Sequence, residues 1–258
     1  MAELPDTVAD ALAEASDDLR VGARNERLTV FVAPAPIDAP GKLSRAQVEG
    51  RQDMYVGAGR PLDTADNAWF HEHVHSRQSY ETGSGMAWFD DASAEYYAAW
   101  LAHEGDHVSR EAFYDYVRTD EASDAVLRDT ESVTDSASYF KGIRVLAALD
   151  GEIRDASDGE RTLQDVFVAM NAHEGPVDDE AFATLVEEAA GEPRDEWLAT
   201  YIGTDAVPAV PDTLGDRTTD RLAAAQLRDE VGDASLVGAV LFVSALVVGV
   251  GTLLTRRD

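Results

Sequence analysis

Apolar residues repeat at the helical period through most of the chain. Near its start, Val8, Leu12 and Ala15 fall on one face of an expected amphipathic helix. Beyond residue 66 the same period recurs between Gly, Pro and Asp breaks, which predicts a series of helices. The expected helical segments are residues 67–80, 86–105, 109–118, 136–156, 162–173, 178–190 and 194–202.

Two short segments near the N-terminus have strand patterns instead. Residues 28–33 (LTVFVA) are β-branched and apolar and end at the Pro-rich stretch 34–41, and a second strand is expected around residues 54–56. Asp63, Thr64 and Asp66 are candidate N-caps for the helix that follows. The chain is therefore expected to be mainly α with a small N-terminal β-sheet, an α+β fold.

A final apolar segment differs from everything before it. Residues 235–254 (SLVGAVLFVSALVVGVGTLL) contain no charge and would span about 30 Å as a helix, which is the thickness of the bilayer hydrocarbon core. We expect one transmembrane helix here, with the lipid bilayer as a partner. The expected organisation is an N-terminal helix and small sheet at 1–60, a helical region at 61–205, a linker with a short helix at 206–234, the span at 235–254 and a tail at 255–258.

The charge of the chain indicates its environment and excludes some classes of partner. The formal net charge is −29, and only two of the 21 basic residues are lysines, Lys42 and Lys141. Such an acidic, lysine-poor surface is tolerated in molar salt, where screening shrinks to about 3 Å, so we interpret the protein as halophilic; an acidic partner-binding surface is the alternative. The charge argues against a nucleic-acid partner. The absence of cysteine excludes disulfides and thiolate chemistry.

The metal-binding pattern HExxH occurs twice. In the first copy, residues 71–75, His71 and His75 are four apart and would share a helix face, where both imidazoles can bind one zinc ion, while Glu72 can act as general base toward water. In the second copy, residues 103–107, Gly105 interrupts the motif and is expected to end a helix, so its two histidines are interpreted as helix-end residues.

The other histidines have other expected roles. His73 would point away from the metal pair and is interpreted as a packing or outer-sphere residue. His173 is expected to be exposed. A catalytic zinc usually takes three protein ligands, and the carboxylates of Asp91 and Glu95, four residues apart in the next predicted helix, are the two candidates for the third.

Residues 88–95 resemble the second zinc helix of the gluzincin metallopeptidases, particularly the glycyl aminopeptidase family and its larger aminopeptidase relatives. There HExxH is followed by a W-x-x-E-G-x-A-type motif whose Glu is the third zinc ligand. Aligned on Trp88, that ligand falls on Asp91, although Glu95 is nearer to the spacing of those relatives. The resemblance favours Asp91 and leaves Glu95 as the alternative.

A second motif is similar to a segment of the same relatives. Residues 139–142 match Y-x-K-G, in which the tyrosine donates a hydrogen bond to the tetrahedral oxyanion, so the resemblance gives this role to Tyr139. It covers roughly residues 65–205 and implies a thermolysin-like catalytic domain with Zn²⁺ as cofactor. No G-x-M-E-N segment precedes the HExxH motif, so exopeptidase specificity is not implied.

These observations predict a membrane-anchored zinc metallopeptidase that hydrolyses a peptide or protein substrate. One alternative is a catalytically lapsed peptidase fold that serves as a membrane-tethered binding or structural module. Another is the same metal site acting on a non-peptide bond.

The apolar segment 235–254 predicts localisation to the cell membrane through a single C-terminal span. Arg256 and Arg257 after the span favour a cytoplasmic C-terminus and an extracellular catalytic domain. Because the first twenty residues lack signal-peptide features, a tail-anchored protein with a cytoplasmic domain is the alternative.

Overall fold

The computed structural model describes residues 5–23, 27–33, 42–48, 51–121, 124–129 and 135–214. Helices dominate these residues, and a small sheet lies near the N-terminus, so the prediction of a mainly helical fold with a small sheet is confirmed. The helices are α1 (Pro5–Asp18), α2 (Ala68–His75), α3 (Phe89–Glu104), α4 (Arg110–Val117), α5 (Asp135–Ala156), α6 (Leu163–Ala172), α7 (Asp179–Ala190) and α8 (Asp195–Tyr201).

The sheet has three strands, β1 (Arg27–Ala33), β2 (Lys42–Val48) and β3 (Arg51–Gly57), in the order β1-β3-β2. β3 is central and pairs parallel to β1 and antiparallel to β2. The two predicted strands correspond to β1 and β3. β2 was not predicted, because its sequence KLSRAQV lacks the β-branched, apolar pattern that identified β1.

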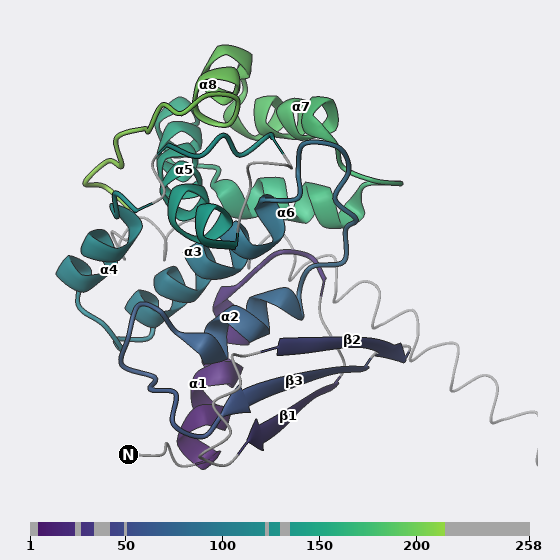
Figure 1. Cartoon of the computed structure of the whole chain (residues 1–258), viewed down its shortest axis with the longest axis vertical. Helices are drawn as coiled ribbons and strands as arrows, with labels where there is room; N and C mark the ends of the chain where they lie inside the picture. The colour runs from purple at the N-terminus through teal and green to yellow at the C-terminus, as the bar shows by residue number, and fades with distance from the viewer. Residues whose placement is uncertain are drawn as a thin grey trace, which may run out of the picture. The chain divides into compact units, whose positions relative to one another are not determined.

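Helix α2 lies between the sheet and the larger helical part of the molecule. It packs against β3 and β2 on one side and against α3 on another, as Figure 1 shows. Its buried side chains include Trp69, Phe70 and Val74. The HExxH motif at residues 71–75 is therefore carried by a helix whose orientation is fixed by packing on more than one side.

A buried arginine joins the end of α2 to α1. Arg77 is 4% exposed, and its guanidinium donates hydrogen bonds to the backbone carbonyls of Ser16 at 3.2 Å and Leu19 at 2.9 Å. A further bond reaches the carbonyl of Ala23. The Ser16 carbonyl lies in the last turn of α1 and the Leu19 carbonyl directly after it, where helical partners run out, so the guanidinium caps α1 and fixes it and the following loop against the end of α2.

Helices α3 and α5 approach each other closely at Gly142. A Cβ atom added there would lie 2.5 Å from the Cβ of Ala92, far inside van der Waals contact. The absence of a side chain at Gly142 and the small one at Ala92 therefore allow the two helices to pack together. This contact brings the N-terminal part of α5, with Tyr139, toward α2.

The segment after α8 differs from its prediction as a linker. Residues 206–214 pack back onto the helices: Leu214 is fully buried, Tyr114 donates a hydrogen bond to its carbonyl, and Arg144 donates one to the carbonyl of Pro208 at 2.9 Å. The first compact unit of the chain ends only at Gly215.

The predicted transmembrane span at residues 235–254 lies outside the described residues, as do the short helix expected near residues 218–230 and the tail at 255–258. Among the helices that the structure describes, none is long and apolar enough to cross a membrane.

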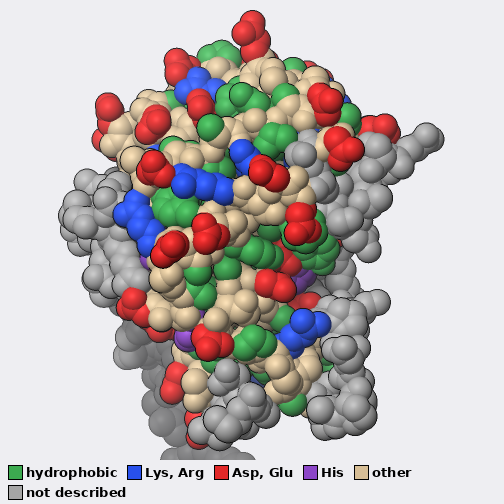
Figure 2. Space-filling model, turned by 60° about the vertical axis from the view of Figure 1, so that its left-hand side comes forward, with side chains coloured by type: hydrophobic (Ala, Val, Ile, Leu, Met, Phe, Trp, Pro, Cys, Tyr) green, Lys and Arg blue, Asp and Glu red, His purple; other side chains and the backbone are tan. Residues whose placement is uncertain are grey.

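On one face of the molecule, acidic side chains are spread out rather than gathered in one patch (Figure 2). On the face drawn in Figure 2, carboxylates are interspersed with fewer basic residues and with small apolar areas. This distribution agrees with the net charge of −29.

Candidate metal centre

Asn67 fixes the start of the helix that carries the HExxH motif. Its side-chain oxygen accepts hydrogen bonds from the backbone N–H groups of Trp69 and Phe70, both at 3.1 Å, and its side-chain nitrogen donates to the carbonyl of Leu62 at 2.8 Å. The N-cap is therefore Asn67, and the expectation of Asp63, Thr64 or Asp66 was wrong. A fully buried Asn can cap the helix and hold the preceding loop at the same time, because it has donors as well as an acceptor.

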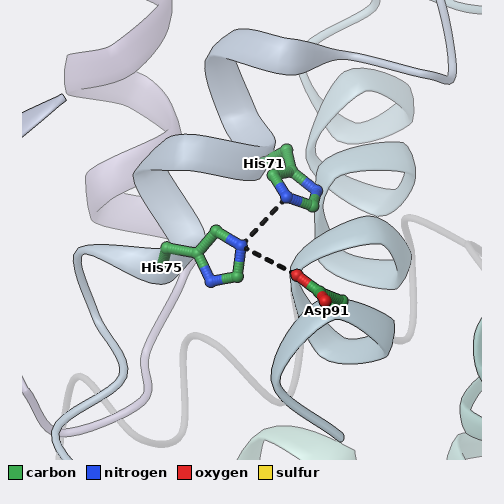
Figure 3. A group of neighbouring side chains, drawn as sticks. All are labelled: His71, His75 and Asp91. Carbon is green, nitrogen blue, oxygen red and sulfur yellow. Dashed lines mark hydrogen bonds and ion pairs between the residues drawn. The ribbon is translucent and has the colours of Figure 1, made fainter. Parts of the chain in front are cut away.

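His71, His75 and Asp91 converge in the structure, as the sequence analysis expected. One potential ligand atom from each lies within 4.8 Å of the other two. Nε2 of His75 is 2.9 Å from Nε2 of His71 and 3.5 Å from Oδ1 of Asp91. Figure 3 shows the histidines extending from α2 toward Asp91 on the neighbouring α3. Two imidazole nitrogens bound to a tetrahedral zinc ion are about 3.3 Å apart, so these separations suit a metal after small adjustments.

Glu95, the alternative third ligand, lies on another side of His71. Its Oε1 is 3.2 Å from Nδ1 of His71, the ring nitrogen that does not face His75. Metal-binding histidines commonly donate their second N–H to a carboxylate, which fixes the tautomer and the ring orientation. The geometry thus groups Asp91 with the two Nε2 atoms and gives Glu95 the position of an outer-sphere partner.

His75 has an equivalent partner in Gln78, which the sequence analysis missed. Nε2 of Gln78 donates to the carbonyl of Asp90 at 2.7 Å and to Oγ of Ser93 at 3.0 Å, both at the start of α3. Its Oε1 must then face Nδ1 of His75, 2.8 Å away, and accept a hydrogen bond from it. The spacing of three residues from His75 is the available sequence signal, but this spacing is common to many surface pairs.

The contacts at the two Nδ1 atoms determine whether the Nε2 atoms of His71 and His75 carry a hydrogen or a lone pair. If Nδ1 of each histidine carries the hydrogen that it donates outward, both Nε2 atoms present lone pairs, and those lone pairs meet across 2.9 Å. Two acceptors at this distance repel each other unless a cation lies between or beside them. A proton or a metal ion can meet that need, and the adjacent Asp91 carboxylate favours either.

The charges around His71 also favour a cation. Burial lowers the pKa of His71, but the carboxylates of Glu95, Glu72 and Asp91 together outweigh it, and the pKa is raised above its usual value. The surroundings therefore stabilise positive charge at the imidazole nitrogens.

Glu72 is buried beside this pair without a complete set of partners. It is 2% exposed, and its Oε2 has no hydrogen-bond partner among the described residues. Burial, the largest cause, raises the pKa of Glu72 above its ordinary value of 4.5. A carboxylate held in this way is a stronger base than an exposed one, which favours a role in proton transfer.

Tyr139 lies against the site through its ring. The rings of Tyr139 and His71 are stacked, with centroids 5.7 Å apart and planes 18° from parallel. The rest of the Y-x-K-G segment is structural: Lys141 is 1% exposed and donates hydrogen bonds to the carbonyls of Ala125 and, at 2.6 Å, Thr204. The structure thus brings the ring of Tyr139 to the candidate metal site, and Lys141 is explained by its burial and its hydrogen bonds to backbone carbonyls.

The second HExxH copy does not form a comparable site in the described residues. Helix α3 ends at Glu104 with Gly105 as its C-cap, as expected, so His107 lies beyond the helix. His103 is buried and its ring is stacked on that of Phe113, with centroids 5.5 Å apart. His73 is buried at 4% exposure, in keeping with a packing role, and His173 is exposed, as expected.

Comparison with known proteins does not assign the chain to a family. No model of a protein family matches the chain, and a search of curated proteins finds no significant match. The candidate site therefore rests on its own geometry and on the motifs that resemble those of gluzincins.

Proposed function

We propose that the chain is a membrane-anchored zinc metallopeptidase with a thermolysin-like catalytic domain. The observation that carries the proposal is the pair of Nε2 atoms of His71 and His75, 2.9 Å apart beside Asp91, with both Nδ1 atoms facing outer acceptors. Two nitrogens and one carboxylate oxygen match the donor set of catalytic zinc sites and leave one position open.

In this proposal His71, His75 and Asp91 bind the metal, and Glu95 and Gln78 orient the two imidazoles. A bound zinc ion supplies Lewis acidity toward a substrate carbonyl and toward water. The choice of zinc comes from the HExxH motif and the gluzincin resemblance, because two imidazoles and one carboxylate also suit other transition metals such as Fe²⁺.

Glu72 is the proposed general base. Its position next to His71 and its raised pKa let it accept a proton from the attacking water and return that proton to the leaving amine. Tyr139 is the proposed donor to the oxyanion. Its support is the stacking of the Tyr139 ring on the ring of His71, which puts the tyrosine beside a proposed metal ligand.

The peptide substrate comes from the gluzincin resemblance, since the site geometry suits other carbonyl electrophiles too. Attachment to the membrane comes from the apolar segment 235–254. We place the catalytic domain outside the cell on the basis of Arg256 and Arg257, and protease treatment of intact cells tests this placement. Complete protection of the domain would refute it.

The test of the function uses the full-length chain purified in detergent and molar KCl. We expect one zinc ion per chain, hydrolysis of an unstructured protein such as casein, loss of hydrolysis after chelation and its return with added zinc. A folded chain that binds no added zinc would overturn the metal centre. Stoichiometric zinc without hydrolysis of any peptide would instead support the lapsed module or a non-peptide substrate.

A further inference from the structure

A tyrosine from a third helix contacts the outer side of the candidate metal centre. The hydroxyl of Tyr116, on α4, donates a hydrogen bond to Oε2 of Glu95 at 2.9 Å, while Oε1 of the same carboxylate faces Nδ1 of His71 at 3.2 Å. A line of polar contacts thus runs from α4 through α3 to the histidine on α2.

Because Glu95 is buried, the position of its carboxylate depends on these contacts. Glu95 is 5% exposed, so its two oxygens depend on protein donors more than on water. Oε2 accepts the hydrogen bond from Tyr116, while Oε1 faces Nδ1 of His71, so the two oxygens contact side chains from two different helices. Removing the phenol hydroxyl would leave Oε2 without its donor and allow the carboxylate to turn away from His71.

The helix that supplies the tyrosine is itself firmly held. Ser109 caps the start of α4 by accepting a hydrogen bond from the N–H of Ala112, and Phe113 stacks on His103 at the end of α3. Near the other end, the guanidinium of Arg118 lies 4.3 Å from the ring centre of Tyr114 and donates a hydrogen bond to the carbonyl of Val210 at 2.9 Å. The second HExxH copy therefore contributes to holding α4 through His103.

We propose that Tyr116 is a positioning residue of the metal centre, which fixes the Glu95 carboxylate so that it orients His71 for metal binding. The inference rests on the proposed metal site and adds a residue that no sequence motif indicates. It does not depend on the bond that the enzyme cleaves.

The test compares metal binding by wild type, Tyr116→Phe and Tyr114→Phe in the full-length chain. Zinc dissociation constants are measured by competition with a chromogenic chelator, and the visible absorption of the Co²⁺-substituted protein reports ligand geometry. Outer-sphere variants typically lose 10- to 100-fold in metal affinity, and we expect Tyr116→Phe, one contact further out, to lose about 10-fold with a changed Co²⁺ spectrum.

Tyr114→Phe is the matched control. Tyr114 lies two residues earlier on α4 and its hydroxyl also donates to an acceptor, the carbonyl of Leu214, but that bond leads away from the metal centre. We expect wild-type zinc affinity and an unchanged Co²⁺ spectrum. Equal losses in both variants would show a general effect of disturbing α4 and would overturn the proposal.

A double variant and a check of folding complete the test. In a Glu95→Gln background, Tyr116→Phe should have little further effect, because the group through which it acts is already changed. The thermal unfolding and circular dichroism of every variant are measured without metal, so that a variant that folds poorly is recognised before its zinc affinity is compared. Wild-type affinity and spectrum in Tyr116→Phe would overturn the inference alone, whereas absence of zinc in folded wild type would overturn the metal centre and the inference together.

Discussion

The carboxylate of Glu95 faces His71 at Nδ1, 3.2 Å away, and not at the nitrogen that points toward His75. This relationship separates two residues that the sequence presents as equivalent. Asp91 and Glu95 are one turn apart on α3, yet one lies with the Nε2 atoms and the other lies behind an imidazole. They should therefore have different effects on metal binding.

Asp91→Ala removes a proposed ligand, whereas Glu95→Gln keeps the shape of an outer-sphere partner. We expect Asp91→Ala to lose stoichiometric zinc at micromolar metal, and Glu95→Gln to keep one zinc ion per chain with an affinity about 10- to 100-fold weaker. Elemental analysis and chelator competition measure both. The reverse ranking would identify Glu95 as the ligand.

Glu72→Gln is expected to keep zinc and lose turnover. The amide has nearly the shape of the carboxylate but cannot accept the proton of the attacking water, and loss of a general base typically costs about 10²- to 10⁴-fold in rate. Casein hydrolysis and zinc content in the same preparation test this prediction. Hydrolysis at the wild-type rate would remove Glu72 from the mechanism.

The same substitution should change how the stability of the metal-free protein depends on pH. Because the pKa of Glu72 is raised by burial, the folded state resists ionisation that the unfolded state accepts freely above about pH 4.5. The wild type therefore loses stability as the pH rises from 4.5 through the folded pKa, and Glu72→Gln does not. We expect the variant to be the more stable at pH 7 and the difference to vanish below pH 4.5, as measured by denaturant unfolding with chelator present.

The small N-terminal sheet and the helices could be predicted because their patterns are local. The apolar period of Val8, Leu12 and Ala15 is repeated in the buried face of α1, and Gly105 ends α3 where a helix-breaking residue was expected. β2 was missed since its sequence has no strand pattern of its own, and its place is set by pairing with β3.

The histidine pair of the candidate site could also be predicted from a local pattern. A spacing of four residues brings His71 and His75 to one face of a helix. The contacts that surround this pair could not be predicted. Glu95 was found only as a rival ligand, because the sequence does not say which nitrogen of His71 it faces, and Tyr116 reaches it from another helix 21 residues away. Such contacts depend on how α2, α3 and α4 pack, which no local spacing encodes.

Gly142→Ala should disturb the contact that brings Tyr139 to the site. The new methyl group would lie 2.5 Å from the Cβ of Ala92 and would force α5 away from α3, at a cost of about 1–3 kcal/mol in the free energy of unfolding. Thermal and denaturant unfolding measure this loss. Gly59→Ala is the control, because an added Cβ there meets nothing within 4 Å, and its stability should change by less than about 0.5 kcal/mol. Equal stability of the two variants would mean that α3 and α5 yield to the added methyl group.

The surface charge predicts that stability depends steeply on salt. With a net charge of −29, mutual repulsion of carboxylates opposes the compact state, and it weakens as the screening length falls from about 10 Å at 0.1 M to about 3 Å at 1 M salt. We expect the melting temperature of the full-length chain to rise continuously with KCl concentration and the protein to unfold in low salt. Non-ionic sucrose at equal osmolality is the control, because it favours the compact state without screening charge. A melting temperature that does not change between 0.1 and 2 M KCl would contradict the halophilic interpretation and would favour an acidic surface that serves to bind a partner.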